Sequence, residues 1–196
     1  MNKKYELLKD DYIEFKGKTL YRIKALRNFD DVKAGDLGGY IEKEDNLGHY
    51  RDCWVYDNAK VFGNARVYEH ARVYDNAEVY EHARVYGNVL IDENAEVHGN
   101  AEVYDNAKVY QNAKVFNNAK ITCNARVYGN AKIEEDTIIG KVSIPYKKIF
   151  QYQCKQRILT AILTEDDKIL YSIGCQHNIT EKEFIDRIHN ENGGLK

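Results

Sequence analysis

Histidine is the side chain here best suited to acid–base or metal chemistry near neutral pH, because its pKa lies close to 7. His98 occupies the hexapeptide VHGNAE, at a position where most neighbouring hexapeptides carry Tyr or Phe. Asp92 lies six residues earlier, and Glu93, Glu96 and Glu102 make the surrounding stretch acidic. An imidazole among carboxylates suits a general base or a metal ligand. A solvated polar patch explains the same residues, so we predict no catalytic residue and keep His98 and Asp92 as the alternative.

The remaining histidines and cysteines are weaker candidates for chemistry. His70 and His82 stand where most hexapeptides carry Asn, so we interpret them as residues that form turns. The four cysteines are far apart and contain no CxxC pair, which disfavours a zinc or dithiol site. We predict no metal and no cofactor, and we favour a protein that is not an enzyme.

The tyrosine content is more unusual than the histidines or cysteines, with sixteen tyrosines in a chain of 196 residues. Ten Tyr or Phe side chains recur at one position of a six-residue pattern: Tyr56, Phe62, Tyr68, Tyr74, Tyr80, Tyr86, Tyr104, Tyr110, Phe116 and Tyr128. Such rings are enriched at protein interfaces. We predict a binding surface that includes Tyr56, Tyr74, Tyr110, Tyr128 and Phe116. Stacking of the rings along the faces of the fold would explain them equally well.

Basic side chains follow the same six-residue spacing near the end of the pattern. Lys108, Lys114, Lys120, Arg126 and Lys132 fill five consecutive hexapeptides, and we add Lys114, Lys120 and Arg126 to the predicted binding surface. A polyanion such as nucleic acid would suit them, but solubility is the simpler explanation. The total charge is nearly balanced, with 29 Lys plus Arg against 31 Asp plus Glu, so it demands neither nucleic acid nor a membrane surface.

All these side chains belong to a repeat of fifteen hexapeptides that runs without insertion from Val55 to Ile144. The first residue is Val or Ile and the fifth is nearly always Ala, which predicts that both point inward. The fourth is mostly Asn, which we expect to form the corner in the left-handed backbone conformation. A six-residue period does not keep one stripe on an α-helix. It predicts triangular coils of 18 residues, about five in number, with corner Asn residues stacked in ladders.

Residues 18 apart share a face of such a prism, which sorts the aromatic side chains into three columns. The first face carries Tyr56, Tyr74, Tyr110 and Tyr128; the second carries Phe62, Tyr80 and Phe116; the third carries Tyr68, Tyr86 and Tyr104.

The segments outside the repeat are predicted to cover its open ends. Strands at 12–15 and 19–26 read as a β-hairpin, and Ile41, Leu47 and Cys53 keep the inward phase of Ala59, which indicates an irregular first coil. After the repeat, 157–163 and 169–174 read as a second hairpin, followed by a short α-helix at 181–190. We predict an all-β chain with an N-terminal cap at 1–54, a parallel β-helix at 55–144 and a C-terminal module at 145–196.

The hexapeptide pattern resembles that of the left-handed β-helix superfamily, which implies the handedness. More specifically, FDDVKAGDLGGYIE at 29–42, DNL at 45–47 and DCWVYDNA at 52–59 resemble the opening of an uncharacterised bacterial and phage family whose members are labelled as transferases. The segment ILYSIGCQHNITEKEFIDRI at 169–188 resembles the C-terminal module of phage members. The resemblance names no catalytic residue, because the label rests on the fold.

These observations lead to a prediction of a non-catalytic, phage- or prophage-type scaffold that binds a macromolecular partner, such as a host-defence protein that it inhibits. The partner is a host protein or a second copy, with a homotrimer as one form and nucleic acid as a weaker option. The alternatives are a hexapeptide-repeat acyltransferase or metal-dependent enzyme, and a purely structural homo-oligomer. No apolar run reaches the length of a membrane span, so we expect a soluble protein in the cytoplasm of a bacterial host.

Overall fold

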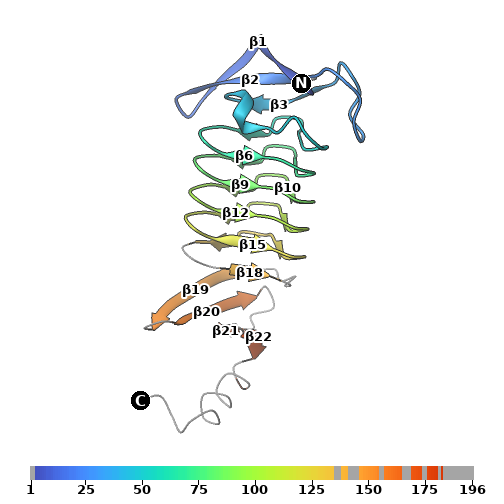
Figure 1. The fold of residues 1–196 in the computed structure, drawn as a ribbon. Coiled ribbons are helices and arrows are strands. Elements are labelled where there is room, and N and C mark those ends of the chain that lie inside the picture. Colours follow the sequence, from blue (N-terminus) through green and yellow to red (C-terminus); the bar gives the residue numbers. More distant parts are fainter. Residues whose placement is uncertain are drawn as a thin grey trace.

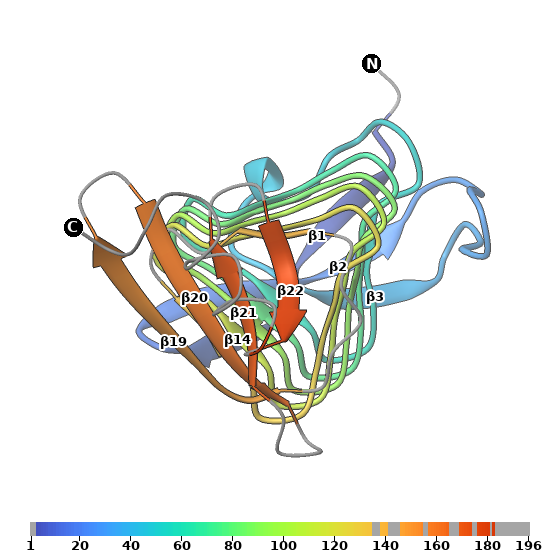
Figure 2. The same ribbon diagram turned by 90° about the horizontal axis from the view of Figure 1, so that it is seen from below.

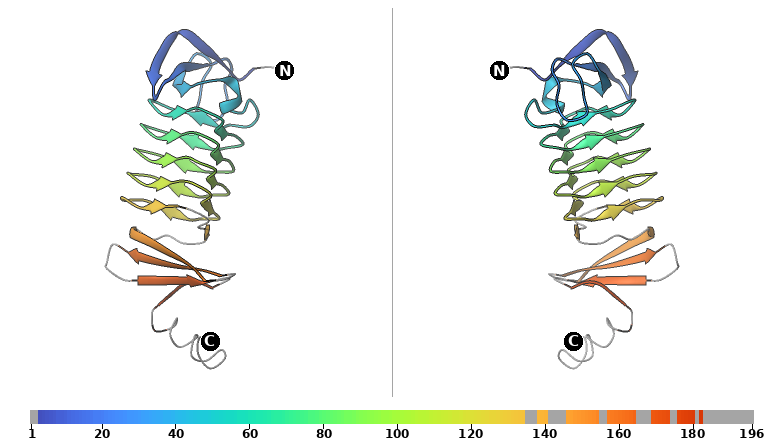
Figure 3. Two further views of the ribbon diagram at one scale, coloured as in Figure 1. Left: turned by 90° about the vertical axis from the view of Figure 1, so that its left-hand side faces the viewer. Right: turned by 90° about the vertical axis from the view of Figure 1, so that its right-hand side faces the viewer.

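The computed structural model describes residues 3–134, 138–140, 146–154, 157–164, 169–173, 176–180 and 182. Three sheets form the sides of a triangular prism of about five coils, and a fourth sheet lies beyond its C-terminal end (Figure 1, Figure 3). The prism is the parallel β-helix that the repeat predicts, with the left hand that the resemblance implies, and Figure 2 shows it along its axis. No described helix is long and apolar enough to cross a membrane.

Each side of the prism is a stack of short parallel strands, one from each coil. Face one consists of β4 (Trp54–Val55), β7 (Arg72–Val73), β10 (Leu90–Ile91), β13 (Lys108–Val109) and β16 (Arg126–Val127). Face two consists of β5 (Lys60–Val61), β8 (Glu78–Val79), β11 (Glu96–Val97), β14 (Lys114–Val115) and β17 (Lys132–Ile133). Face three consists of β6 (Arg66–Val67), β9 (Arg84–Val85), β12 (Glu102–Val103), β15 (Lys120–Thr122) and β18 (Ile138–Gly140).

The inside of the prism is filled by the first and fifth residues of each hexapeptide, as predicted. Strands pair 18 residues apart, so that Val61 lies beside Val79 and Val79 beside Val97. Every Val, Ile or Ala at these positions from 55 to 133 is no more than 2% exposed. β-Branched side chains pack well on a pleated surface, and alanine fits where the chain closes on itself at a corner.

The corners differ from the prediction in one respect: the left-handed residue is the third of the hexapeptide and not the fourth. Asp57 has a φ of 48° and Glu69 a φ of 63°, whereas no fourth-position residue among those described has a positive φ. Glycine, which adopts a positive φ without steric cost, occupies several of these third positions.

The fourth-position asparagines contribute through their side chains instead. Asn88 donates a hydrogen bond from Nδ2 to Oδ1 of Asn106 at 3.1 Å. The same bond joins the pairs Asn94–Asn112, Asn100–Asn118 and Asn112–Asn130. These bonds confirm the predicted ladders and explain the preference for Asn without a left-handed backbone.

The N-terminal cap is an extension of face two. The hairpin of β1 (Tyr5–Phe15) and β2 (Lys18–Ala25) confirms the predicted hairpin, with a longer first strand. β3 (Leu37–Ile41) pairs antiparallel with β2 and parallel with β5, so it joins the hairpin to the prism. The hairpin crosses the N-terminal end of the prism (Figure 1), and Tyr5 and Ile23 are buried in one core with the valines of the coils.

The irregular first coil is present, but its predicted phase is wrong at two of three residues. Ile41 lies beside Val61 and Leu47 beside Val67, which is a spacing of 20 residues. Both therefore take the valine position rather than the alanine position. Trp54 pairs with Arg72 at the regular spacing of 18, so Cys53 keeps the predicted phase. Two extra residues must fall between Leu47 and Cys53, in a loop that follows the short helix η1 (Glu44–Asn46).

The C-terminal sheet contains the predicted hairpin and two further strands. β20 (Arg157–Thr164) pairs antiparallel with β21 (Ile169–Ile173), while β19 (Tyr146–Cys154) and β22 (Gln176–Thr180) flank them. Figure 2 shows the sheet lying across the C-terminal end of the prism, and β17 contacts β19. The predicted α-helix at 181–190 lies outside the described residues except for Lys182, which is helical.

Candidate binding surface

The aromatic side chains form stacked ladders on the outside of all three faces. On face one the ring centroids of Tyr56 and Tyr74 are 4.1 Å apart, and those of Tyr110 and Tyr128 are 5.0 Å apart. Asp92 occupies the place between Tyr74 and Tyr110, so it divides this ladder into an upper and a lower pair. The four predicted tyrosines of face one therefore form two separate stacked pairs and not one continuous ladder.

Face two carries a continuous ladder that includes the histidine. Its members are Phe62, Tyr80, His98 and Phe116, with centroid separations of 5.0, 4.6 and 5.2 Å and interplanar angles of at most 5°. Phe15 of the hairpin packs edge-on against Phe62 at the upper end. The imidazole thus takes the place that a tyrosine or phenylalanine takes in other coils.

Face three carries Tyr68, Tyr86 and Tyr104, stacked at 4.9 and 5.2 Å. Burial raises the pKa of Tyr86 to about 12, so its phenol is a neutral hydrogen-bond donor at physiological pH. Ring stacking along each face, one of the two explanations for the aromatic pattern, is confirmed.

Stacking determines which part of each ring a partner would meet. Rings about 5 Å apart cover one another's faces and point their edges and hydroxyl groups outward. Each described ladder side chain is partly exposed except Phe62, which is buried under the hairpin. The surface therefore offers rows of phenol edges, which suit lateral packing and hydrogen bonding more than the stacking of a flat ligand.

The two alternative catalytic residues, His98 and Asp92, lie on different faces. Asp92 follows β10 on face one, where its Oδ1 accepts a hydrogen bond from the backbone N–H of Glu93 at 2.7 Å. His98 follows β11 on face two. The structure therefore gives no carboxylate–imidazole pair between them.

His98 instead has a carboxylate neighbour that the sequence did not reveal. Its Nδ1 lies 3.7 Å from Oε2 of Glu81, one coil above, and the same oxygen accepts the backbone N–H of Gly99 at 2.7 Å. Burial in the ladder lowers the pKa of His98, although Glu81 and Glu96 act in the opposite direction. At this distance the carboxylate lies near the imidazole, and burial favours the neutral form of the ring.

The predicted basic residues differ in how they are paired. Lys114 Nζ lies 2.6 Å from Glu96 Oε1, and Lys120 Nζ lies 3.9 Å from Glu102 Oε2. Arg126 is exposed and forms no ion pair with any residue that the structure describes. Two of the three predicted cations are therefore already neutralised within the prism.

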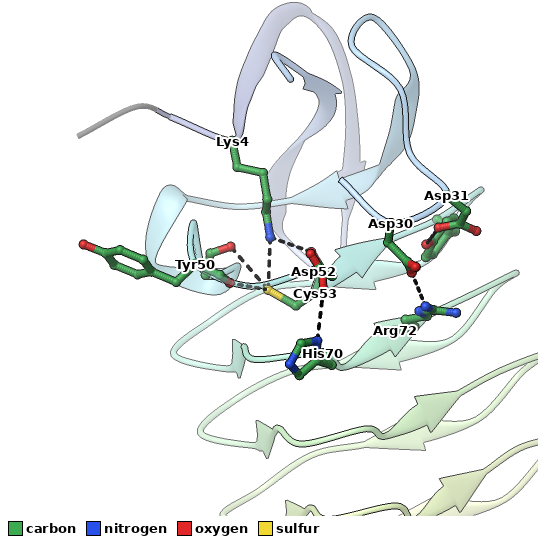
Figure 4. A network of polar contacts seen from close by, with 10 residues as sticks. Lys4, Asp30, Asp31, Tyr50, Asp52, Cys53, His70 and Arg72 are labelled. Carbon is green, nitrogen blue, oxygen red and sulfur yellow. Dashed lines mark hydrogen bonds and ion pairs between the residues drawn. The ribbon is translucent and has the colours of Figure 1, made fainter. Parts of the chain in front are cut away.

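The N-terminal cap covers the upper end of the faces, which the sequence did not predict. Figure 4 shows Asp30 of the loop after β2 pointing to Arg72 of face one, with which it forms an ion pair, and Asp31 beside it. The hydroxyl of Tyr56 donates to Asp31 at 2.7 Å. On face two, Lys16 lies 4.3 Å from the ring centroid of Tyr80. The lower coils are therefore the more accessible part of faces one and two.

A buried lysine holds this cap to the first coil. Lys4 Nζ donates to the backbone oxygen of Cys53 at 2.6 Å and to its Sγ at 3.2 Å, and both side chains are fully buried (Figure 4). Burial lowers the pKa of Lys4 and raises the pKa of Cys53. A buried thiol with a raised pKa is chemically inert, so this contact is structural.

The described ranges contain no group of three or more His, Cys, Asp or Glu side chains placed to hold a metal ion. Asp52 and His70 lie one coil apart, with His70 Nδ1 3.1 Å from Asp52 Oδ2, and both are substantially exposed (Figure 4). This pair sits in the corner column that Asn88 and Asn106 continue, as expected for a corner residue.

The comparisons with known proteins give one short similarity. No protein-family model matches the chain. The chain is 45% identical over 51 residues to the "Uncharacterized acetyltransferase YdcK" of Escherichia coli (strain K12), and the match covers 26% of this chain. It spans 16% of that relative's length. The chain is therefore a parallel β-helix with a short stretch similar to an acetyltransferase, in partial agreement with the resemblance to hexapeptide-repeat proteins labelled as transferases.

Proposed function

We propose that this protein is a non-catalytic scaffold that binds a macromolecular partner through the aromatic ladders on faces one and two of its β-helix. The observation that carries the proposal is the row of outward Tyr and Phe side chains on these two faces of a prism whose coils have no protruding loop between 54 and 134. A rigid prism presents these side chains at fixed spacing and loses little conformational entropy when a partner binds.

The chemistry of the ladders supports a protein partner. Aromatic side chains, and tyrosine above all, are enriched at the centres of protein interfaces. The ladders expose phenol edges about 5 Å apart, close to the spacing of neighbouring β-strands. A host protein and a second copy of the chain remain the proposed partners, with a homotrimer as one form. Phage origin and inhibition of a host defence stay predictions that await a captured partner.

Site-specific cross-linking in the host cell tests the proposal. We expect a photoreactive phenylalanine analogue at Tyr110 to capture one defined partner, and the same analogue at exposed Tyr50 of the cap loop to capture none. The double variant Tyr110→Ala, Tyr128→Ala should abolish binding of that partner, while Tyr68→Ala, Tyr86→Ala serves as the matched two-ring control on face three. Equal loss of partner binding in the two double variants, or no partner captured from either cross-linking position, would contradict the proposal.

An acyltransferase is the second candidate, because two observations favour it. One is the 45% identity to an acetyltransferase over 51 residues. The other is the proximity of the Glu81 carboxylate, 3.7 Å from Nδ1 of His98, to an imidazole whose neutral form burial favours. A neutral imidazole is the form that acts as a general base.

Acetyl-CoA hydrolysis and transfer to a panel of amines and hydroxyl acceptors separate the two candidates. If the protein is an acyltransferase, turnover should be measurable and His98→Phe should abolish it without unfolding the ladder. The binding proposal requires the opposite result, with no turnover above the background of free acetyl-CoA in either protein. Turnover that His98→Phe leaves unchanged would exclude His98 as the base.

A further inference from the structure

Charge is segregated along the prism axis. Residues 88–106 contain five acidic residues and no Lys or Arg: Asp92, Glu93, Glu96, Glu102 and Asp105. Residues 107–134 contain five basic residues and one acidic residue: Lys108, Lys114, Lys120, Arg126, Lys132 and Glu134. The fold stacks these segments directly, so an acidic coil lies above about one and a half basic coils.

On faces two and three, ion pairs join the acidic coil to the basic residues below it. Face one has no such pair among the described residues. On faces two and three an acid lies above the first lysine, as in the pairs Glu96–Lys114 and Glu102–Lys120. On face one the corresponding residue is Leu90, which lies beside Lys108 in the sheet. Lys108 in turn lies beside Arg126. Face one thus places two cations in neighbouring strands without an acid in the column above them.

These two cations are exposed, and no acid lies beside them within their own sheet. Neither Lys108 nor Arg126 forms an ion pair with a residue in the described ranges. The corner beside them carries the uncharged Gln111 and Gly129, and Gln111 Oε1 accepts the backbone N–H of Gly129 at 2.7 Å. Asp105 lies on the opposite corner, where its carboxylate accepts hydrogen bonds from Thr122 Oγ1 and the backbone N–H of Cys123 and forms no ion pair with either cation. Like charges side by side in a sheet repel each other.

The same corner is strongly acidic only higher on the prism. It carries Asp57, Asp75 and Glu93 at its third positions, with Asp92 close by. The pKa of Asp75 is raised by partial desolvation and by the nearby charges of Asp92 and Asp57. Face one is thus polarised, with its acids above and its uncompensated cations below.

We propose that lower face one, defined as Lys108, Tyr110, Arg126 and Tyr128, docks an acidic segment of a partner protein. This inference rests on the proposed binding function and adds the face and the charge of the partner. Carboxylates would pair with the two cations, while the half-buried Tyr110 and Tyr128 supply ring edges and phenol groups beside them. An acidic segment would also relieve the repulsion between Lys108 and Arg126.

Two features favour an acidic protein over nucleic acid. Single-stranded nucleic acid binds by stacking bases on open aromatic faces, but Tyr110 and Tyr128 cover each other. Two cations neutralise only two phosphates, and nucleic-acid affinity grows with the number of phosphates that a protein neutralises. Lys114 and Lys120 lie on other faces, so they do not extend this patch in one line.

Fluorescence anisotropy with two labelled probes tests the inference. The first probe is a synthetic peptide of alternating Glu and Ala, and the second is an oligothymidine of similar charge. We expect the peptide to bind the full chain at low salt and more weakly at high salt. The double variant Lys108→Glu, Arg126→Glu should weaken binding of the peptide about tenfold or more, because each reversal turns an attraction into a repulsion.

Face three offers a matched control, because Arg66 and Arg84 are also exposed neighbours in one sheet. Acids lie close to them, since Glu102 is the partner of Arg84 in the sheet and Glu69 lies on the adjoining corner. Arg66→Glu, Arg84→Glu should therefore leave peptide binding within about twofold of the wild type. Equal loss in both variants, or tighter binding of oligothymidine than of the peptide at lower face one, would overturn the inference.

The outcome can be separated from that of the proposed function by repeating the Tyr110 cross-link in the Lys108→Glu, Arg126→Glu background. Loss of the captured partner supports the acidic docking surface. Unchanged capture means that the partner binds without these charges, so the inference fails while the binding function stands. Absence of any captured partner with wild-type charges counts against the binding function itself.

Discussion

At the scale of single residues, His98 shows how context decides the role of a reactive side chain. Its place in the hexapeptide marks it as an outward residue, and its type suggests acid–base chemistry. In the structure its ring lies 4.6 Å from that of Tyr80 and 5.2 Å from that of Phe116, nearly parallel to both. The imidazole therefore contributes to stability as an aromatic ring, whatever else it does.

This position leads to a prediction about acid stability. Burial lowers the folded-state pKa of His98 below the ordinary value of 6.5, so the unfolded chain binds its proton first as the pH falls. The contribution of His98 is present above the unfolded pKa and is lost as the pH falls from that value towards the folded pKa. His98→Phe keeps the stacked ring and removes this proton, so it should lose less stability on acidification than the wild type does.

Thermal melting followed by circular dichroism at about pH 8 and about pH 5 checks this prediction, since the lower value lies below the ordinary histidine pKa. Tyr80→Phe is the control, because it alters the same ladder but removes a phenol that titrates far above this range. The prediction is wrong if His98→Phe and the wild type show the same decrease in melting temperature.

At the scale of elements, the corners are the part of each coil most sensitive to substitution. The third residue must adopt a positive φ and lies directly above the same residue of the next coil. A Cβ on Gly87 would lie 2.6 Å from the backbone oxygen of Asp105, and one on Gly99 would lie 2.6 Å from the backbone nitrogen of Asn117. Other third positions hold residues with a Cβ, such as Asp57 and Glu69, so the clash is specific to the close approach of the backbone at these glycines.

We predict that Gly87→Ala destabilises the prism far more than Gly17→Ala does. Gly17 lies in the β1–β2 turn with a φ of 73°, close to the 82° of Gly87, but nothing lies within 4 Å of its added Cβ. Gly17→Ala should therefore cost about 1–2 kcal/mol from the left-handed backbone alone. Gly87→Ala adds a backbone clash and should cost roughly twice as much or more. Urea unfolding measures both, and equal losses would contradict the close approach of the coils.

At the scale of the whole molecule, the prism behaves as a stack of equivalent coils between two attachments. Each coil packs only on its neighbours, so stability is expected to be a sum of coil and interface contributions. The single Trp of the chain, Trp54, lies at one end of this stack. It is buried against Tyr5 and Phe29 of the cap, with ring centroids 6.0 and 5.3 Å away. Its fluorescence therefore reports on the cap and the first coil.

Removal of one whole coil tests this view. Deletion of 89–106 removes 18 residues and places Ala107 where Val89 stood, so every inward residue stays inward. We expect a folded, slightly less stable protein with native Trp54 fluorescence. Deletion of 89–105 removes one residue fewer and would place Lys108 at an inward position. That variant should lose cooperative unfolding, because a shift by one residue exchanges the two faces of each strand.

Circular dichroism and Trp54 emission during heating compare the two deletions. Cooperative melting of the shorter chain lacking 89–106, together with broad or absent melting of the other, is the expected result. If both deletions melt alike, the six-residue register does not control the fold.

The features that the sequence determined by itself are those that repeat with the period of six. Val55 to Ile133 and the alanines between them face inward because a β-branched or small residue at every first and fifth position fits only the inside of a three-sided coil. The same spacing sorted Tyr68, Tyr86 and Tyr104 onto one face, where the structure stacks them. These relationships are local in sequence, so no long-range information is needed to find them.

Only the tertiary structure decided the features that depend on non-repeating segments and on side-chain packing between coils. It placed the left-handed residue at the third position, put Ile41 beside Val61 two residues out of phase, and set Asp30 against Arg72. It also set Glu81 beside His98 and left Lys108 and Arg126 without an acidic partner among the described residues. Contacts of this kind join residues on different coils or on the cap, and their energies depend on distances that a sequence pattern does not contain.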